Sequence, residues 1–161
     1  MLEARLLNIG KTKFRWVSAG IQHYQKLMKP FAKLSIDEVK PVTGSWAPAE
    51  LMKKEAERFR GNIDRGETIV CLDRDGQRFT SGALARWVGS QSERGASLVF
   101  VIGGSEGLDP EFKRRSALTI SLSPMTFPHD LVRLVFVEQF YRALTILHGH
   151  PYHKETKRTR K

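Results

Sequence analysis

The sequence predicts a single-domain α/β protein with a mostly parallel sheet and helices on both faces. Short apolar segments rich in β-branched residues alternate along the chain with segments of helical periodicity, which is the order of a layered α/β fold. A chain of 161 residues and 18.3 kDa also suits one hydrophobic core. Finally, the chain contains no internal repeat and no linker-like stretch that would divide it.

Five apolar segments are predicted to form the strands of this sheet. They are residues 2–9, the alternating segment around 34–36, and residues 68–72, 98–102 and 118–122. Thr68–Leu72 is continuous and rich in β-branched residues, as expected of a strand that is buried on both faces. Leu98–Ile102 is the most apolar of the five and runs directly into two glycines.

Five segments between and after these strands are predicted to be helices. They are residues 14–28, residues 48–59 with Pro48 at the start, a helix that Ser81 caps, residues 110–116, and a helix from Asp130 to about His148. In the first of them, apolar residues recur at steps of three and four and stop before Pro30, which indicates one buried face. Asp130 is expected to cap the last helix.

The last helix is apolar on almost every side, so it needs cover on most of its surface. A second copy of the chain is one natural source of that cover, and we therefore expect a homodimer. Glu138 and Arg142 are four residues apart and can pair on one face. Arg133 is in line with apolar residues near the helix start, where it either extends along the surface to solvent or binds an anion.

The charge of the chain indicates a polyanionic partner. Lys and Arg number 27 against 17 Asp and Glu, a formal net charge of +10. The last eight residues contribute +4 of this charge, so the remainder of the chain is basic as well. RNA or DNA is favoured over a membrane surface, because no basic amphipathic helix of the interfacial type is present. The alternative is a soluble basic protein with a disordered end.

The composition also indicates the cellular compartment of the protein. No apolar run approaches the length of a membrane span, and the first residues lack the pattern of a signal peptide. A single cysteine, Cys71, excludes an intramolecular disulfide. These features predict a cytoplasmic protein.

Three loops are candidates for a ligand site, because ligands of parallel α/β sheets bind at the carboxyl ends of the strands. They follow Leu72, Ile102 and Leu122. The second contains Gly103, Gly104 and Gly107, which permit close backbone approach to a ligand or simply a tight turn. The third contains two prolines and two apolar residues, which suits a flat apolar ligand or packing against a neighbouring subunit.

Two apparent motifs do not lead to a function. The segment Gly10–Thr12 resembles the end of a phosphate-binding loop, but Arg5 occupies the position that this motif requires to be glycine. His148, His150 and His153 cluster near the end of the last helix without a cysteine and with one nearby acid, so we expect no metal site there.

Four motifs together resemble one family in order and spacing. They are Val99–Leu108, Ser121–His129, Glu138–Ala143 and Pro151–Glu155. The chain is similar through these motifs to the ribosomal large subunit pseudouridine methyltransferase H family, the minimal members of the SPOUT superfamily. The resemblance implies a deep trefoil knot in the C-terminal half and a homodimer. It further implies S-adenosyl-L-methionine bound in the knot and methylation at N3 of a pseudouridine in large-subunit (23S) rRNA, with the ribosome as partner.

The resemblance also assigns roles to residues. The cofactor-binding residues that it implies are Leu72, Gly103, Gly104, Leu122, Ser123, Pro124, Met125, Thr126 and Phe127. The catalytic candidates are His129, Arg142, Tyr152 and His153, and the candidate RNA contacts are Arg133, Lys154, Lys157 and Arg158. Residues 1–155 form the methyltransferase domain, and residues 156–161 are a basic C-terminal extension beyond the usual end of the family. No metal is required.

Two other functions remain open at this point. One is a non-catalytic RNA- or ribosome-binding protein of the same fold, and the other is a small regulator that binds nucleotides.

Overall fold

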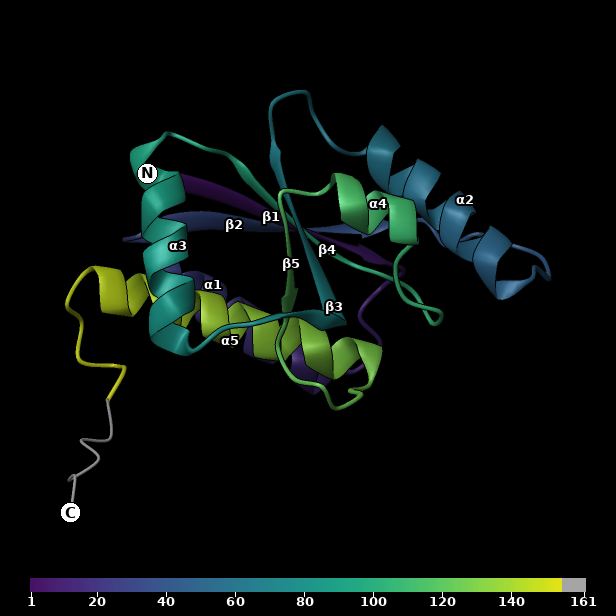
Figure 1. The fold of residues 1–161 in the computed structure, drawn as a ribbon. Helices are drawn as coiled ribbons and strands as arrows, with labels where there is room; N and C mark the ends of the chain where they lie inside the picture. Colours follow the sequence, from purple (N-terminus) through teal and green to yellow (C-terminus); the bar gives the residue numbers. More distant parts are fainter. Residues whose placement is uncertain (155–161) are drawn as a thin grey trace, which may run out of the picture.

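The computed structural model describes residues 1–154, which form a five-stranded parallel sheet and five helices (Figure 1). The strand order is β2-β1-β4-β3-β5. The elements in chain order are β1 (Leu2–Ile9), α1 (Arg15–Met28), β2 (Ala32–Val39), α2 (Pro48–Gly61), β3 (Thr68–Arg78), α3 (Ser81–Glu93), β4 (Leu98–Ile102), α4 (Pro110–Arg115), β5 (Leu118–Ser121) and α5 (His129–Leu147).

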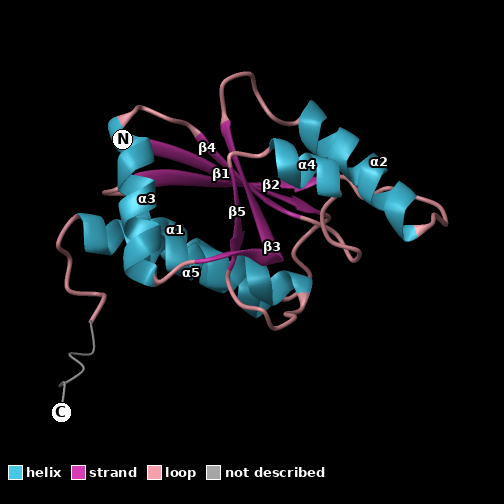
Figure 2. Cartoon of the chain, in the orientation of Figure 1, coloured by secondary structure: helices cyan, strands magenta, loops and turns pink. Residues whose placement is uncertain are grey.

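The helices cover both faces of the sheet, which confirms the predicted fold class (Figure 2). Helices α1, α3 and α5 share one core cluster with the sheet, in which Phe100 of β4 contacts Phe136 and Phe140 of α5. Helices α2 and α4 lie on the opposite side, where Phe59 and Phe112 pack in a second cluster. The sheet is therefore buried on both sides, as its continuous apolar strands require.

Strand β4 is the centre of the molecule because it pairs with β1 on one side and β3 on the other. All five of its residues are buried. Helix α5 is held against this centre between α1 and α3. Gly20 of α1 leaves room for Leu134, and Gly89 of α3 leaves room for Leu147, because an added Cβ at either glycine would lie 2.8 Å from the leucine side chain.

Two expected helix caps differ in the structure. Thr80, rather than Ser81, caps α3 and accepts a hydrogen bond from the Ala83 N–H at 3.1 Å. Asp130 lies inside the first turn of α5 and does not cap it. Its carboxylate instead accepts from the N–H groups of Lys13 and Phe14, at 2.7 and 2.8 Å, and so joins α5 to the segment that precedes α1. A short-range cap pattern could not indicate a partner more than one hundred residues away.

Strand β3 continues to Arg78, beyond the expected end at Leu72. An irregularity between Leu72 and Gln77 lets both of these residues pair with Ile120. Gly76 fits inside this irregularity, since a Cβ there would lie 2.7 Å from the Ile120 backbone carbon. The polar residues 73–78 are typical of a turn, so the sequence did not predict that the strand continues through them.

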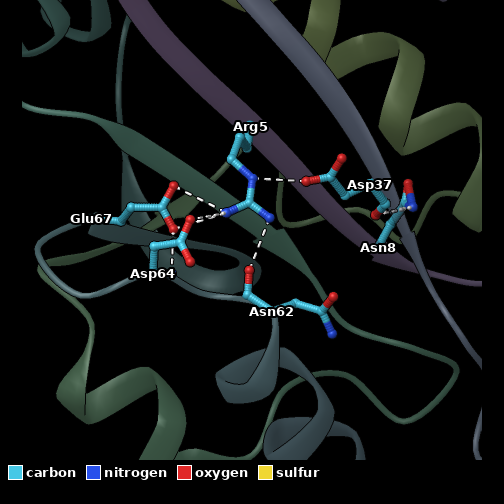
Figure 3. A network of polar contacts seen from close by, with 6 residues as sticks. All are labelled: Arg5, Asn8, Asp37, Asn62, Asp64 and Glu67. Atoms are coloured by element: carbon cyan, nitrogen blue, oxygen red, sulfur yellow. Dashed lines mark hydrogen bonds and ion pairs between the residues drawn. The ribbon is translucent and has the colours of Figure 1, made fainter.

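Arg5 forms a polar network at the side of the sheet that faces α2 (Figure 3). Its guanidinium donates to the carboxylates of Asp37 at 2.7 Å and Glu67 at 2.9 Å, and to the Asn62 carbonyl at 2.9 Å. The Glu67 carboxylate is almost completely buried. Arg5 therefore ties β1 to β2 and to the turn between α2 and β3.

We expect replacement of Arg5 by methionine to lower the free energy of unfolding by about 2–3 kcal/mol, because it leaves a buried carboxylate without its cation. Urea unfolding at a fixed protein concentration measures this difference. Arg114→Met is the matched control, since Arg114 is exposed and pairs only with Glu111 on the surface of α4, where the loss should stay below about 0.5 kcal/mol. Equal losses for the two variants would contradict the structural role of Arg5.

Candidate active site

The three candidate loops leave one edge of the sheet side by side. The register pairs Leu72 of β3 with Ile102 of β4 and with Ile120 of β5. The irregular part of β3 that begins at Asp73 therefore lies at the same level as the loops that begin at Gly103 after β4 and at Leu122 after β5. The loop residues that were predicted from three separate segments of the sequence lie at one edge of the fold.

The glycines of the second loop allow its backbone to pack closely on itself and to adopt a positive φ. A Cβ on Gly103 would lie 2.5 Å from the Gly107 carbonyl oxygen. Gly107 has a φ of +85°, in the left-handed region that favours glycine. Gly104 and Gly107 also form a bridge across the loop. The close approach that we expected Gly103 to make to a ligand is thus made to its own loop, which turns back sharply on itself.

The third loop, residues 122–128, is fixed by side-chain contacts and carries an exposed apolar tip. The Met125 N–H donates to Ser123 Oγ at 3.1 Å, and Arg74 donates to Thr126 Oγ1 at 3.2 Å. The second of these contacts joins the third loop to the segment after Leu72. Met125 is 73% exposed, which is unusual for an apolar side chain. A flat apolar surface pressed against this loop would cover it.

Buried polar atoms without a hydrogen-bond partner, among the described residues, are found near this edge. They are Asn8 Oδ1 at the end of β1, Ser121 Oγ at the end of β5, Arg133 Nε in the first turns of α5, and Glu55 Oε2 against Gly104. Buried polar groups in native proteins almost always have partners, and exceptions concentrate where a ligand or water completes them. This edge is thus the part of the described chain with unmet hydrogen-bonding capacity.

A second polar cluster is built around the C-terminal half of α5. Glu138 accepts two hydrogen bonds from Arg142, at 3.0 and 2.5 Å, and one from the Tyr152 hydroxyl at 3.0 Å. The Arg142 guanidinium also lies over the Tyr152 ring, 4.8 Å from its centroid, and its Nη1 is 3.2 Å from His153 Nδ1. The pairing of Glu138 with Arg142, which the sequence spacing indicated, is confirmed.

The electrostatics of this cluster define which groups can donate a proton. Burial, together with hydrogen bonds to Tyr24 and Glu138, raises the pKa of the Tyr152 phenol, so Tyr152 stays protonated at neutral pH. The bond to Glu138 raises the pKa of Arg142. Because a guanidinium only donates, His153 Nδ1 must accept from it, and a neutral His153 then carries its proton on Nε2. The cluster is a set of hydrogen-bond donors rather than a base.

The catalytic candidates do not all lie together in one protomer. His129 is the exposed first residue of α5, beside the third loop, whereas Arg142, Tyr152 and His153 are at the other end of the helix (Figure 1). With a rise of 1.5 Å per residue, Arg142 lies roughly 20 Å along the helix from His129. The structure therefore separates the loop edge from the C-terminal cluster within one chain.

Arg133 is a correction to the expected RNA contacts. Its side chain is buried, with 3% of the residue exposed, and it donates to Thr12 Oγ1 at 2.9 Å and to the Ile9 carbonyl at 2.7 Å. Burial lowers the pKa of its guanidinium. Arg133 therefore fixes the β1–α1 segment against α5, and its buried guanidinium is not exposed for contact with an RNA phosphate. Among the other candidates, Lys154 is exposed, while Lys157 and Arg158 lie outside the described residues.

The three C-terminal histidines have separate partners. His148 lies against the Phe31 ring and the Leu144 carbonyl, His150 contacts Tyr152 N–H, and His153 faces Arg142. No group of three or more metal-ligating side chains was found in residues 1–154. Nor does any helix in this part of the chain meet the length and hydropathy needed to cross a bilayer.

The sequence reading missed three participants. Tyr24 belongs to the apolar face predicted for residues 14–28, yet its hydroxyl lies 3.4 Å from that of Tyr152. Arg74 lies in the irregular part of β3 and donates a hydrogen bond to Thr126 of the third loop, and no sequence pattern predicted this contact. Glu55 is buried on α2 beside Gly104. One signal could have identified Glu55, namely its position four residues before Phe59, which places both on one helix face.

A surface cavity of about 740 Å³ lies away from both clusters, between α2 and α4. Its lining alternates cations such as Lys53, Arg60 and Arg114 with the acids Glu57 and Glu111. No strand end contributes to it. We regard it as a solvated groove between two charged helices.

A parallel α/β sheet with a constrained glycine turn and a proline-stiffened loop at one carboxyl edge is typical of α/β enzymes, whose ligands commonly bind at that edge. A family model described as "Predicted SPOUT methyltransferase" matches residues 2–153. The chain belongs to the SPOUT methyltransferase family and is a methyltransferase.

Relatives agree with this assignment over nearly the whole chain. The protein named "Ribosomal RNA large subunit methyltransferase H" from Pelobacter propionicus is 40% identical over 153 residues, covering 94% of this chain and 99% of that protein. A protein of the same name from Symbiobacterium thermophilum is 40% identical over 161 residues, covering 95% and 100%. A crystal structure of a putative methylase family protein from Neisseria gonorrhoeae shares the fold, with a TM-score of 0.50 at 16% identity, covering 96% of this chain and 87% of that one.

Proposed function

We propose that this enzyme transfers a methyl group from S-adenosyl-L-methionine to N3 of a pseudouridine in large-subunit rRNA, and that it works as a homodimer on ribosomal particles in the cytoplasm. The observation that carries the proposal is the pair of clusters, with constrained loops at the carboxyl edge and a separate set of donors on α5. The names of the relatives support rRNA as the substrate. The net charge of +10 supports a polyanionic partner.

The residues at the loop edge fit the cofactor. The third loop offers apolar surface at Met125 and Phe127 for an adenine ring, and the backbone of Gly103 and Leu122 lies beside it for the polar groups of the cofactor, with Gly104 shaping the loop. Glu55 and Glu106 make this part of an otherwise basic protein acidic, which suits a ligand with a sulfonium and an ammonium group. When bound there, the cofactor supplies an electrophilic methyl group.

The C-terminal cluster suits the other requirement of the reaction. An imide nitrogen becomes nucleophilic when its proton leaves, and negative charge then spreads onto the neighbouring carbonyl oxygens. Arg142 and the Nε2–H of His153 are donors that can stabilise this charge, and Tyr152 holds Glu138 so that the arginine keeps its orientation. His129, exposed beside the third loop, remains available as the proton acceptor. Lys154, adjacent to His153, is placed to contact an RNA phosphate.

A homodimer would bring the two clusters together. Leu131, Val135, Glu138 and Arg142 lie on one face of α5, opposite its buried phenylalanines. Helix α1 packs against α5 and carries further exposed apolar side chains, with Trp16 59% and Leu27 39% exposed. Two copies that pack antiparallel through this surface place the donors of one protomer near the loops of the other.

The variant Val135→Glu is expected to give monomers that keep their fold, because a carboxylate buried in an apolar interface costs several kcal/mol. Light scattering should report half the wild-type mass while circular dichroism stays unchanged. Gln22→Glu, on the exposed face of α1 away from the stripe, is the control. Leu144, by contrast, is buried within the protomer, so a charge there tests folding instead of dimerisation. An unchanged dimer mass for Val135→Glu would contradict this interface.

Transfer of tritium from methyl-labelled S-adenosyl-L-methionine to ribosomes tests the function. Free large subunits, joined ribosomes and protein-free rRNA serve as separate substrates, and digestion of the product to nucleosides locates the label. We expect label in N3-methylpseudouridine of the large-subunit rRNA. Label in another nucleoside, or binding of the cofactor without transfer to any of the three substrates, would overturn the proposal.

A further inference from the structure

Glu55 is the buried acid of a helix whose other charges face solvent. It lies on α2 between the exposed Lys53 and Glu57, yet only 4% of its surface is exposed. Its neighbours Ala56 and Phe59 belong to the core cluster beneath α2. An apolar side chain could fill this position without the cost of desolvating a carboxyl group. The presence of glutamate therefore calls for a specific partner.

That partner is the glycine loop after β4. The Glu55 carboxyl lies against Gly104, so close that a Cβ on Gly104 would overlap it, and the Gly104 backbone N–H lowers the pKa of the carboxyl. The second oxygen, Oε2, is buried and has no partner among the described residues. Burial, with a contribution from Glu106, raises the pKa of Glu55 against the opposing effect of the Gly104 bond. The loop after β4 thus packs against a side chain of α2.

We propose that Glu55 is a positioning residue for the cofactor, which holds the Gly104 N–H so that the loop 103–107 keeps the shape that faces the ligand. This inference rests on the proposed function, since it assumes that this loop contacts S-adenosyl-L-methionine. The bridge between Gly104 and Gly107 closes the loop on itself, but its tip at Ser105 and Glu106 is exposed, and Glu55 is the contact that joins Gly104 to α2. Without the carboxyl, the N–H of the half-buried Gly104 would lose this acceptor and the loop would open.

Two substitutions separate the hydrogen bond from simple packing. Glu55→Leu keeps an apolar side chain of similar size in the core but removes the acceptor, whereas Glu55→Gln keeps an acceptor oxygen. We expect Glu55→Leu to weaken S-adenosyl-L-methionine binding in titration calorimetry by about 10-fold or more, the effect of one buried unpaired donor. Glu55→Gln should stay within about 3-fold of wild type on the same grounds. Glu57→Leu, at the exposed position two residues on, is the control.

Amide hydrogen exchange of the protein without cofactor supplies an independent readout. Exchange in residues 103–107 should rise in Glu55→Leu and not in Glu55→Gln, while the melting temperature of Glu55→Leu is maintained. Wild-type binding is measured first, so that absence of any cofactor affinity counts against the proposed function alone. If wild type binds and Glu55→Leu binds equally well, or if Glu55→Gln is as defective as Glu55→Leu, the positioning role is wrong.

Discussion

Replacing Arg142 by alanine should lower methyl transfer to ribosomal particles by about 10²- to 10³-fold, the usual cost of removing one donor that stabilises developing charge. Cofactor affinity should change little, because Arg142 is proposed to stabilise charge on the target base and not to bind the cofactor. Single-turnover transfer of labelled methyl measures the first quantity and calorimetry the second. The expected signature is a loss of rate with binding retained.

Arg142→Lys is the informative companion variant. Lysine preserves the positive charge but cannot contact Glu138 and His153 at once, as the guanidinium does. We expect it to recover only a small part of the lost rate. Full activity of Arg142→Lys would reduce the role of Arg142 to charge alone, and full activity of Arg142→Ala would remove it from the site.

The variant Gly103→Val should weaken S-adenosyl-L-methionine binding by about 100-fold or more, equivalent to about 3 kcal/mol of lost binding free energy. The physical reason is a collision within the loop, where the new Cβ would lie 2.5 Å from the Gly107 carbonyl oxygen. The loop must then open, and its backbone leaves the edge where the three loops meet. Calorimetry measures the affinity, and circular dichroism checks that the sheet persists.

Gly61→Val provides a matched control for this experiment. Gly61 ends α2, and a Cβ there would have no atom within 4 Å, so the same substitution meets open space. We expect normal cofactor affinity from it. Equal affinity of Gly103→Val and Gly61→Val would show that the loop after β4 does not hold the cofactor.

The two site variants can also be mixed. In a dimer that shares its clusters, a protomer with Arg142→Ala still has intact loops, and one with Gly103→Val still has intact donors. Random exchange makes half of the dimers mixed, each with one complete site, so the mixture should recover about a quarter of wild-type activity. A mixture that is no more active than its components would indicate that each protomer supplies its own donors.

Much of the fold could be predicted because its signals are local. The apolar run 98–102 and the helical spacing of residues 14–28 each identify an element, and both elements are present. The order of the strands needs pairings between distant segments, which no pattern in one sequence defines. The caps show the same limit, since Asp130 reads as the cap of its own helix yet binds Lys13 and Phe14. The trefoil knot that the resemblance implies stays a prediction.

The candidate site, like the fold, could be predicted from the sequence only in part. The three loops were predicted correctly to share one edge, because carboxyl ends of parallel strands always do. Arg133 was expected to contact RNA because its spacing places it on a face of the last helix. The spacing could not show that the β1–α1 segment covers this face. Glu55 had almost no signal, since a buried glutamate in a charged helix looks like its exposed neighbours. Its role appears only when α2 and the loop after β4 are seen together.

The joint between α5 and the β1–α1 segment has a consequence for the order in which the chain folds. Asp130 and Arg133 contact Lys13, Phe14, Thr12 and Ile9, partners 116 to 124 positions away in sequence. Contacts of such long range form late and slow the folding of a domain, because a large loop must close first. Residues 122–147 are among the last to be synthesised, so the contacts of Asp130 and Arg133 with the β1–α1 segment cannot form until α5 has been translated.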